Sequence, residues 1–338
     1  MRYFSSTATS RTAAVGVLSA ATAVLVACGG QVTSDAHDSS SGQTVTVTNC
    51  GRQLVFPKTP KRVVGLMPTQ TDLLVRLGAA GELAGQAQTA VSTLPVDIAG
   101  QVRDVPVLSQ DAPPSRETLL AVQPDLVVSP TSYEFTASQG FADIDQLARS
   151  GAAAYIATGG CADRRNTAEV SDVLTDIRNL GEILGHRDIA ARLSGDAERR
   201  LAAVTAAIEG RPRPTVAQLY VEGNSLSAIG AGVEADIIKR AGGSNVFDPH
   251  SDEFADFFAA QINPEEIISR APEVIVFGVT DRTHELQTRD YLARTFPDVP
   301  AVRDGRLIAL SESDLHPGTL GNVGAVDAVA RGLHPDSF

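Results

Sequence analysis

The sequence lacks any run of basic residues. Its formal net charge is −12, and only three of its 28 Lys and Arg residues are lysines, at positions 58, 61 and 239. Nucleic acid binding depends on clustered Lys and Arg that neutralise phosphate groups. The charge therefore argues against a nucleic-acid-binding protein, and we interpret the scarcity of lysine as a compositional bias.

Common catalytic and metal-binding motifs are also absent from the sequence. It contains no G-x-S-x-G, H-E-x-x-H or phosphate-loop pattern, and Ile229-Gly-Ala-Gly-Val is only a weak glycine-rich turn. Its six histidines, at 37, 186, 250, 284, 316 and 334, show no H-x-x-x-H spacing. Bare zinc or manganese needs several convergent ligands, so this pattern favours an intact small molecule or a metal held inside an organic chelate.

The N-terminal apolar stretch is too short to cross a membrane. It runs from about residue 12 to 26, whereas a spanning helix needs about 20 apolar residues. Arg2 and Arg11 precede it and Leu25-Val-Ala-Cys28 ends it, which is typical of an export signal. The ending resembles the lipobox of bacterial lipoproteins, in which the Cys is acylated. We expect a signal peptide over 1–27 and lipidation at Cys28; an ordinary cleaved signal is the alternative.

The next segment is poor in apolar residues. Residues 28–42 are rich in Ser, Gly and Asp and predict a flexible tether. The remaining chain, with 43% hydrophobic residues in the full sequence, is long enough for one large domain or two medium ones. We therefore expect an extracytoplasmic globular body, anchored to the cell membrane by the lipid.

Two cysteines remain, Cys50 and Cys161. In an oxidising compartment an isolated pair favours a disulfide, which would attach the first hairpin to the edge of the N-terminal half. Two buried thiols or two metal ligands are the alternatives.

From residue 43 the patterns predict alternating strands and helices. The expected strands are 43–48, 53–56, 62–67, 125–129, 153–157, 216–221, 274–278 and 307–310. The expected helices are 69–77, 117–122, 143–149, 167–184, 188–208, 235–241, 265–269, 288–293 and 325–332. Thr69 with Asp72 reads as a capping-box start, and Gly78 as the stop of that helix. Continuous apolar strands indicate mostly parallel, covered sheets.

Two short motifs occur twice in the same order. Asp72–Gly78 (DLLVRLG) returns as Asp236–Gly242 (DIIKRAG), and Glu117–Val128 (ETLLAVQPDLVV) returns as Glu265–Val276 (EEIISRAPEVIV). The longest predicted helix, 188–208, lies between the copies. The chain thus predicts two similar α/β lobes, 43–185 and 211–338, joined by a long interlobe helix at 186–210. Such a helix resists hinging, so we expect little lobe closure.

The leading glutamate of each Glu motif has a simple local explanation. Ser115 and Asn263 are suited to cap the helices, which places Glu117 and Glu265 in first turns. Carboxylates there are favoured by the helix dipole by about 0.3–1 kcal/mol. Helix stabilisation alone therefore explains the residue type.

The whole pattern over residues 43–338 resembles the substrate-binding proteins of ABC importers, in the metal-chelate class that serves ferric siderophores, haem and cobalamin. The resemblance rests on residues 60–64, 71–78, 117–127, 241–247, 265–276 and 333–338. It implies a class III periplasmic-binding-protein fold, no enzymatic activity, no intrinsic cofactor and a monomer. It also implies that Glu117 and Glu265 dock onto arginines of two permease subunits related by two-fold symmetry, where charge complementarity sets register.

The ligand is expected between the lobes, beyond the carboxyl ends of the strands. The candidates in the loops there are Met67, Thr69, Gln70, Tyr133, Phe135, Glu222, Asn224, Asp281, Arg282 and His316. The aromatic residues could equally be local core, and Arg282 and His316 could be surface. Phe254, Phe257 and Phe258 are expected to pack under the cleft rather than to stack on ligand.

The expected ligand is a ferric siderophore or a similar metal chelate. Among the loop residues considered, Arg282 is one cation against the acids Glu134, Glu222 and Asp281, which disfavours a highly anionic catecholate complex. Ferric hydroxamates, haem, cobalamin or a phosphate-bearing cofactor precursor stay open. An extracytoplasmic enzyme and a ligand-free scaffold lipoprotein are the alternatives of another class.

Overall fold

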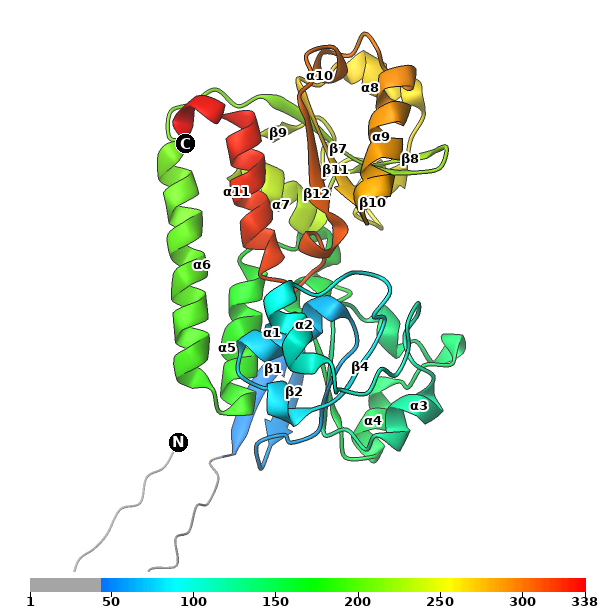
Figure 1. The fold of residues 1–338 in the computed structure, drawn as a ribbon, viewed down its shortest axis with the longest axis vertical. Coiled ribbons are helices and arrows are strands. Elements are labelled where there is room, and N and C mark those ends of the chain that lie inside the picture. Colours follow the sequence, from blue (N-terminus) through cyan, green and yellow to red (C-terminus); the bar gives the residue numbers. More distant parts are fainter. Residues whose placement is uncertain (1–43) are drawn as a thin grey trace, which may run out of the picture. The chain divides into compact units, whose positions relative to one another are not determined.

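The computed structural model describes residues 44–338, which form two α/β lobes beside one long helix (Figure 1). The predicted signal peptide, Cys28 and the tether lie outside the described residues. We call residues 45–184 the N-lobe and residues 215–338 the C-lobe.

The N-lobe contains a four-stranded parallel sheet in the order β4-β3-β5-β6. Its strands are β3 (Val63–Gly65), β4 (Leu83–Gln86), β5 (Leu126–Ser129) and β6 (Ala153–Ile156), and its helices are α1 (Pro68–Arg76), α2 (Val96–Val102), α3 (Arg116–Ala121), α4 (Ile144–Arg149) and α5 (Asp172–Leu184). The expectation of parallel, covered strands is confirmed here. The sequence patterns missed β4 and α2.

An antiparallel hairpin, β1 (Val45–Asn49) and β2 (Arg52–Phe56), lies at the β6 edge. The Asn49 side chain donates to the Ile156 carbonyl at 2.6 Å and accepts from the Ile156 N–H at 2.9 Å. A disulfide joins Cys50 in the hairpin turn to Cys161, just after β6. The hairpin is thereby fixed to an otherwise unpaired sheet edge.

The C-lobe sheet is mixed, in the order β10-β8-β7-β11-β12. Its strands are β7 (Thr215–Glu222), β8 (Ser225–Ile229), β9 (Ser244–Asn245), β10 (Ala259–Gln261), β11 (Val274–Val279) and β12 (Leu307–Ser311), and its helices are α7 (Gly232–Arg240), α8 (Pro264–Arg270), α9 (Arg282–Thr295), α10 (Pro300–Arg303) and α11 (Gly321–Leu333). The strands β7, β11 and β12 are parallel, whereas β8 and β10 are added antiparallel. The sequence patterns missed β8, β9, β10 and α10.

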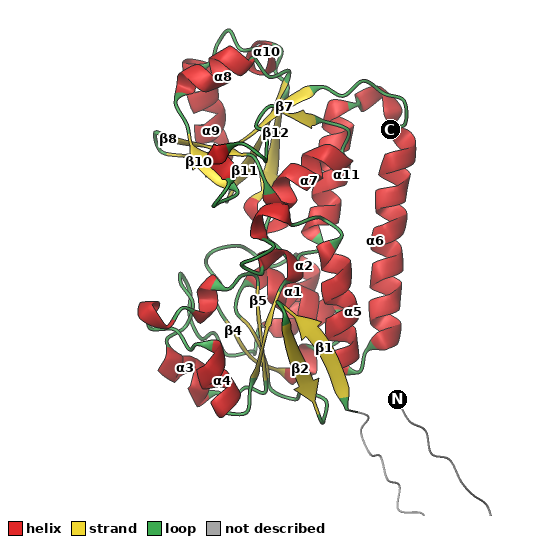
Figure 2. Cartoon of the chain, turned by 180° about the vertical axis from the view of Figure 1, so that it is seen from behind, coloured by secondary structure: helices red, strands yellow, loops and turns green. Residues whose placement is uncertain are grey.

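The long helix α6 (Arg187–Ala207) has 21 residues and matches its prediction closely. It packs against α5 of the N-lobe and against α7 and α11 of the C-lobe, along one side of both lobes (Figures 1 and 2).

The largest hydrophobic core runs through both lobes. It includes Val63 and Ile177 of the N-lobe, Val204 of α6, and Ile237 and Val326 of the C-lobe. The opposite sheet faces have separate cores, under α3 and α4 in the N-lobe and under α8 and α9 in the C-lobe. A shared core opposes separation of the lobes and supports the expectation of little closure, which stays a prediction.

The first repeated motif forms α1 and α7, which occupy equivalent places in the two lobes. Asp72 pairs with Arg76 at 2.8 Å in α1, and Asp236 pairs with Arg240 in α7. Gly78 and Gly242 end these helices with φ of +89° and +84°. The two copies of the motif therefore form the same helix, with the same ion pair and the same glycine end, in each lobe.

Several helix starts differ from prediction; α7 and α11 begin earlier than predicted, at Gly232 rather than 235 and at Gly321 rather than 325. Helix α1 begins at Pro68, after Met67, and has no side-chain cap, so the predicted capping box at Thr69 is wrong. The fixed φ angle of proline suits the first position of a helix, which explains the earlier start. Helix α5 begins at Asp172 rather than 167, because Ala168 is extended and the Val170 N–H donates to Asp236 of the C-lobe. Helix α9 begins at Arg282 rather than 288, because Asp281 caps it by accepting from the His284 N–H at 2.8 Å.

Candidate ligand-binding cleft

The segments after the strands of the two lobes meet at one junction. Gln70, in the first turn of α1, donates from Nε2 to the Pro317 carbonyl at 3.3 Å, in the segment after β12. At Gly318 a Cβ would stand 2.4 Å from the Ala157 Cβ, just after β6. Only glycine permits so close an approach, so the main chain at Gly318 of the C-lobe packs against the side chain of Ala157 in the N-lobe.

A cavity of about 250 Å³ lies beside this junction, on the C-lobe side. Tyr220 and Ser227 line it from the sheet, and Glu234 lines it from the first turn of α7. Glu312 and His316 line it from the segment after β12. Such a place, at the carboxyl ends of β11 and β12, is where open α/β sheets bind ligands.

Arg165 closes the cavity from the N-lobe segment between β6 and α5, residues 157–171, which we call the crossing segment because it packs against α7 of the C-lobe. Its guanidinium lies 4.4 Å from the ring centre of Phe258, a cation–π contact. Glu234 on one lobe and Glu134 on the other both attract it, although burial lowers the pKa of Arg165. Its Nη1 atom is buried without a hydrogen-bond partner.

Glu234 is the most perturbed acid of the cavity. Burial raises its pKa to about 8, although the positive charge of Arg165 lowers it by more than the negative charge of Glu312 raises it. One oxygen of Glu234 accepts a hydrogen bond from Gln218 Nε2 at 2.9 Å, and Gln218 is wholly buried. The carboxyl is therefore held largely neutral at pH 7.

The segment after β12 supplies two further titratable groups. Burial lowers the pKa of His316 to about 4, and the positive charge of Arg165 acts in the same direction. Burial also raises the pKa of Glu312, and Glu222 adds to that rise. His316 is therefore a neutral polar group near pH 7 rather than a cation.

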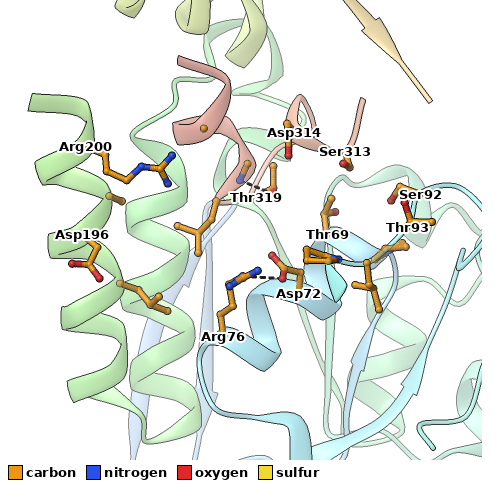
Figure 3. A pocket seen from close by; sticks show the side chains of 18 residues that line it. Thr69, Asp72, Arg76, Ser92, Thr93, Asp196, Arg200, Ser313, Asp314 and Thr319 are labelled. Atoms are coloured by element: carbon orange, nitrogen blue, oxygen red, sulfur yellow. Dashed lines mark hydrogen bonds and ion pairs between the residues drawn. The ribbon is translucent and has the colours of Figure 1, made fainter. Parts of the chain in front are cut away.

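A second cavity, of about 430 Å³, lies on the α6 side of the molecule (Figure 3). It is bounded by α1, the segment before α2, α6 and the start of α11. Its central ion pair is Arg76 with Asp72, and Arg76 also lies 3.4 Å from Asp97. Asp196, Arg200 and Asp314 also line it, so its walls carry charges of both signs.

The structure places the predicted ligand residues in different surroundings. His316 lines the junction cavity, and Thr69 lines the α6-side cavity. Met67, Gln70 and Phe135 are buried, and Phe135 belongs to the N-lobe core. Tyr133 is 54% exposed and packs edge-on against Phe141.

The other candidates are exposed on the C-lobe. Glu222 and Asn224 lie at the turn between β7 and β8. Asp281 caps α9, and Arg282 pairs with Glu285 at 2.6 Å. None of these four lines the junction cavity.

The sequence reasoning missed Arg165, Tyr220, Glu234 and Glu312, and it favoured packing under the cleft over ligand stacking for Phe258. The internal repeat could have identified Glu234 as a cleft residue. In the repeated Asp motif, Glu234 stands two positions before Asp236, as Gln70 stands two positions before Asp72. Both are first-turn residues that point to the junction.

A sequence profile for the family described as periplasmic binding proteins matches residues 63–313. The chain belongs to this family. None of the curated protein sequences compared with it matches.

Solved structures share its fold. A periplasmic binding protein from Veillonella parvula is 22% identical, covers 86% of this chain and 98% of its own, and gives a TM-score of 0.75. The ABC-type Fe3+-hydroxamate transport system structure from Saccharomonospora viridis is 22% identical, with coverages of 85% and 98% and a TM-score of 0.69. A periplasmic heme binding protein from Pseudomonas aeruginosa is 21% identical, with coverages of 82% and 93% and a TM-score of 0.64.

Membership in the periplasmic binding protein family defines the general role. Such proteins are extracytoplasmic, bind small molecules and work with ABC permeases, and they are not enzymes. No helix within residues 44–338 is long and apolar enough to cross a membrane. Within the same residues, no three His, Cys, Asp or Glu side chains are grouped as metal ligands would be.

In this periplasmic binding protein, Glu117 and Glu265 are both exposed in the first turns of α3 and α8. These helices lie on different lobes, on the side away from α6 (Figures 1 and 2). A backbone hydrogen bond and, after it, the contact with Arg116 at 2.8 Å lower the pKa of Glu117. Ser115 caps α3 as predicted, whereas Asn263 at the start of α8 makes no side-chain cap.

Proposed function

We propose that this protein captures an iron(III)–siderophore complex or a related metal chelate in the junction cavity and delivers it to an ABC importer. The observation that carries the proposal is the make-up of that cavity. It combines an aromatic wall (Tyr220, Phe258) with hydroxyl, carboxyl and imidazole groups, and the described residues show no cluster of direct metal ligands. Such a lining suits the organic shell of a chelate rather than a bare ion.

Delivery would use Glu117 and Glu265 as the two anchors on a two-fold symmetric permease. Their equivalent positions on the two lobes support this role, and charge complementarity would steer the encounter. Acylation of Cys28, which the sequence favours, would hold the protein at the membrane. Cobalamin, haem or a phosphate-bearing cofactor precursor is the alternative cargo.

Calorimetry of the full chain tests the proposal. The titrants are a ferric trihydroxamate, a ferric tris-catecholate, haem and cobalamin, with each iron-free siderophore as the matched control. The chain has no tryptophan, so calorimetry is preferable to intrinsic fluorescence. We expect a dissociation constant of about 1 µM or below for a ferric chelate. Failure to bind all four titrants, with turnover of an ester or phosphate substrate, would refute the proposal in favour of an enzyme.

A further inference from the structure

Arg165 brings an N-lobe side chain into the junction cavity on the C-lobe side. The crossing segment is held against the C-lobe at Arg165 and at the next residue. Asn166 donates from Nδ2 to the carbonyls of Phe254 and Ala255, both at 3.0 Å. A Cβ at Gly232 would stand 2.9 Å from the Arg165 carbonyl oxygen, so this contact requires glycine. The main chain therefore fixes where Arg165 enters the cavity.

The guanidinium of Arg165 is oriented by stacking but has no hydrogen-bond partner. It lies 4.4 Å from the ring centre of Phe258. Its Nη1 atom is buried and unpartnered, and within residues 44–338 neither a hydrogen bond nor an ion pair joins the side chain to another residue. A buried charged donor without a partner is costly, because it has lost water without gaining an acceptor. The geometry therefore indicates that the missing acceptor belongs to a ligand.

The two acids that attract Arg165 do not take the place of this acceptor. Glu134 is buried and accepts from two hydroxyl groups close to it in the sequence, at 2.9 and 2.6 Å. Glu234 accepts from Gln218, and burial keeps its carboxyl largely protonated near pH 7. Both acids act on Arg165 from a distance, without an ion pair in the described part of the chain. The positive charge of Arg165 is therefore available to a ligand.

The rest of the cavity adds polar groups and little charge. Tyr220 and Ser227 line it with hydroxyl groups. His316 is neutral near pH 7, because burial lowers its pKa to about 4. Burial also raises the pKa of Glu312, which disfavours its charged form. Among the described lining residues Arg165 is the one cation, so the cavity matches a ligand group with a single negative charge.

We propose that the chelate bound in the junction cavity carries a free carboxylate, and that Arg165 binds this carboxylate. The inference rests on the proposed function and names a chemical group of its ligand. The planar fork of a guanidinium donates two parallel hydrogen bonds to the two oxygens of a carboxylate, so it recognises shape as well as charge. The carboxyl of Glu234 and the hydroxyl of Tyr220 line the same cavity and are further donors for the remaining lone pairs.

The experiment compares two probes that differ in one charge. A linear ferric trihydroxamate with a terminal carboxylate is titrated into the full chain beside its methyl ester, in which the charge is gone and the iron site is unchanged. A ferric tris-catecholate is the probe whose negative charge lies around the iron instead. By calorimetry we expect the carboxylate form to bind at least about tenfold more tightly than either of the other two probes.

Variants assign the preference to Arg165. Arg165→Gln removes the charge and should reduce the ratio between carboxylate and ester affinities toward one. Arg165→Lys keeps the charge without the planar fork and should give an intermediate ratio. Arg192→Gln, on the exposed surface of α6, removes a charge outside the cavity and should leave the ratio as it is. A thermal melt of each variant shows whether it is folded.

Haem is a second source of the same chemical group, because its propionates are carboxylates. It is titrated into the wild type and into Arg165→Gln. A haem affinity that falls by about tenfold or more in the variant, with no preference between the two hydroxamate probes, supports the inference and assigns the carboxylate to haem.

Equal or tighter binding of the ester, together with equal haem affinity in the wild type and Arg165→Gln, overturns the inference while the proposed function stands. Tighter binding of the tris-catecholate than of the carboxylate probe and haem does the same. An unchanged carboxylate preference in folded Arg165→Gln, or in Arg165→Lys if only that variant folds, overturns the assignment to Arg165. Absence of binding by every chelate overturns the proposed function itself, and the inference with it.

Discussion

Asp125 in the N-lobe and Glu273 in the C-lobe hold the start of a neighbouring strand in the same way. The Asp125 carboxylate accepts from the N–H groups of Lys61 and Arg62 at 2.7 and 2.9 Å, just before β3. The Glu273 carboxylate accepts from the Thr215 N–H at 2.8 Å, at the first residue of β7. Gln123 precedes Pro124 and Ala271 precedes Pro272. Both have a left-handed backbone conformation, with φ of +45° and +43°. The two Glu motifs therefore form the same helix–turn–strand unit.

Glu117 lies eight positions before Asp125, and Glu265 lies eight positions before Glu273. The two glutamates therefore occupy equivalent surface positions on the two lobes. We predict that Glu117→Arg with Glu265→Arg lowers ligand uptake through the cognate ABC importer by about tenfold or more, because two attractive anchors become repulsive. Ligand affinity should not change, since neither glutamate lines the junction cavity or the α6-side cavity. Uptake by cells and calorimetry on the purified chain measure the two quantities.

The control for docking reverses the same number of charges elsewhere. Glu198→Arg with Glu209→Arg changes two exposed glutamates, on α6 and just beyond its end. Uptake equal to the wild type is expected for this control. Equal uptake in the Glu117/Glu265 variant would count against docking, and a loss of ligand affinity would show that the substitutions act on the cleft.

The repeated Asp motif predicts the behaviour of its two terminal glycines. At Gly78 a Cβ would stand 2.8 Å from Ile189 Cδ1 near the start of α6, and at Gly242 it would stand 2.7 Å from His334 Nε2 and 3.0 Å from Ile208 Cδ1 near the end of α6. Both glycines also have positive φ, where alanine is strained. We predict that Gly78→Ala and Gly242→Ala each lower the free energy of unfolding by about 1–3 kcal/mol.

Urea unfolding measures this loss, with Gly100→Ala as the matched control. Gly100 lies in α2 with open space around it, and alanine is favoured over glycine in a helix by up to about 1 kcal/mol. The control should therefore be neutral or more stable. A neutral Gly78→Ala or Gly242→Ala would show that α6 does not need the close approach of these helix ends.

The sequence predicted those elements that carry strong local signals. Helix α6 has a long apolar period and glycine or proline at both ends, and the hairpin of β1 and β2 has alternating apolar residues. Strands β8 and β10 are short, with Ser, Ala and Gln among their residues, and their pairing in the sheet defines them more than their pattern does.

The cleft was harder to predict, because its residues come from separate segments. Arg165 is one arginine among many in the sequence, and only the crossing between the lobes brings it to Phe258 and Glu234. Loops after strands pointed to His316, which lines the junction cavity, but the helix cap at Asp281 and the ion pair of Arg282 depend on where α9 begins. The internal repeat, which aligns Glu234 with Gln70, was the one available signal for a cleft acid.

The disulfide between Cys50 and Cys161 closes a long loop, with 111 residues of sequence separation. A cross-link of this length limits the unfolded chain and typically stabilises by about 2–5 kcal/mol. We predict that Cys50→Ser with Cys161→Ser lowers the free energy of unfolding by this amount. Reductant should destabilise the wild type to a similar level and leave the double variant unchanged. Equal stability of the two proteins under oxidising conditions would contradict the prediction.

Asp176 in α5 gives the last prediction, which concerns pH. One of its oxygens accepts from Tyr155 Oη at 2.8 Å and from the N–H and hydroxyl of Thr158 at 2.9 and 2.7 Å. The other oxygen has no partner and faces Gly318 of the C-lobe. Burial outweighs these hydrogen bonds and raises the pKa of Asp176 from 3.8 to about 6.

The raised pKa of Asp176 determines how the stability of the protein changes with pH. A carboxyl with a raised pKa in the folded state binds its proton more tightly than in the unfolded chain. Its stabilising contribution is complete below pH 3.8 and is lost as pH rises through about 6, with about 3 kcal/mol in total since one pKa unit equals 1.36 kcal/mol. Asp176→Asn removes the titration, so its stability relative to the wild type should increase by about this amount between pH 4 and pH 8.

Urea unfolding at several pH values measures the difference, and Asp163→Asn makes the same chemical change on the exposed surface. The comparison across pH separates titration from any constant effect of asparagine on the three hydrogen bonds. If the difference between Asp176→Asn and the wild type is flat from pH 4 to pH 8, the carboxyl is solvated, because loss of solvation is the largest cause of its raised pKa.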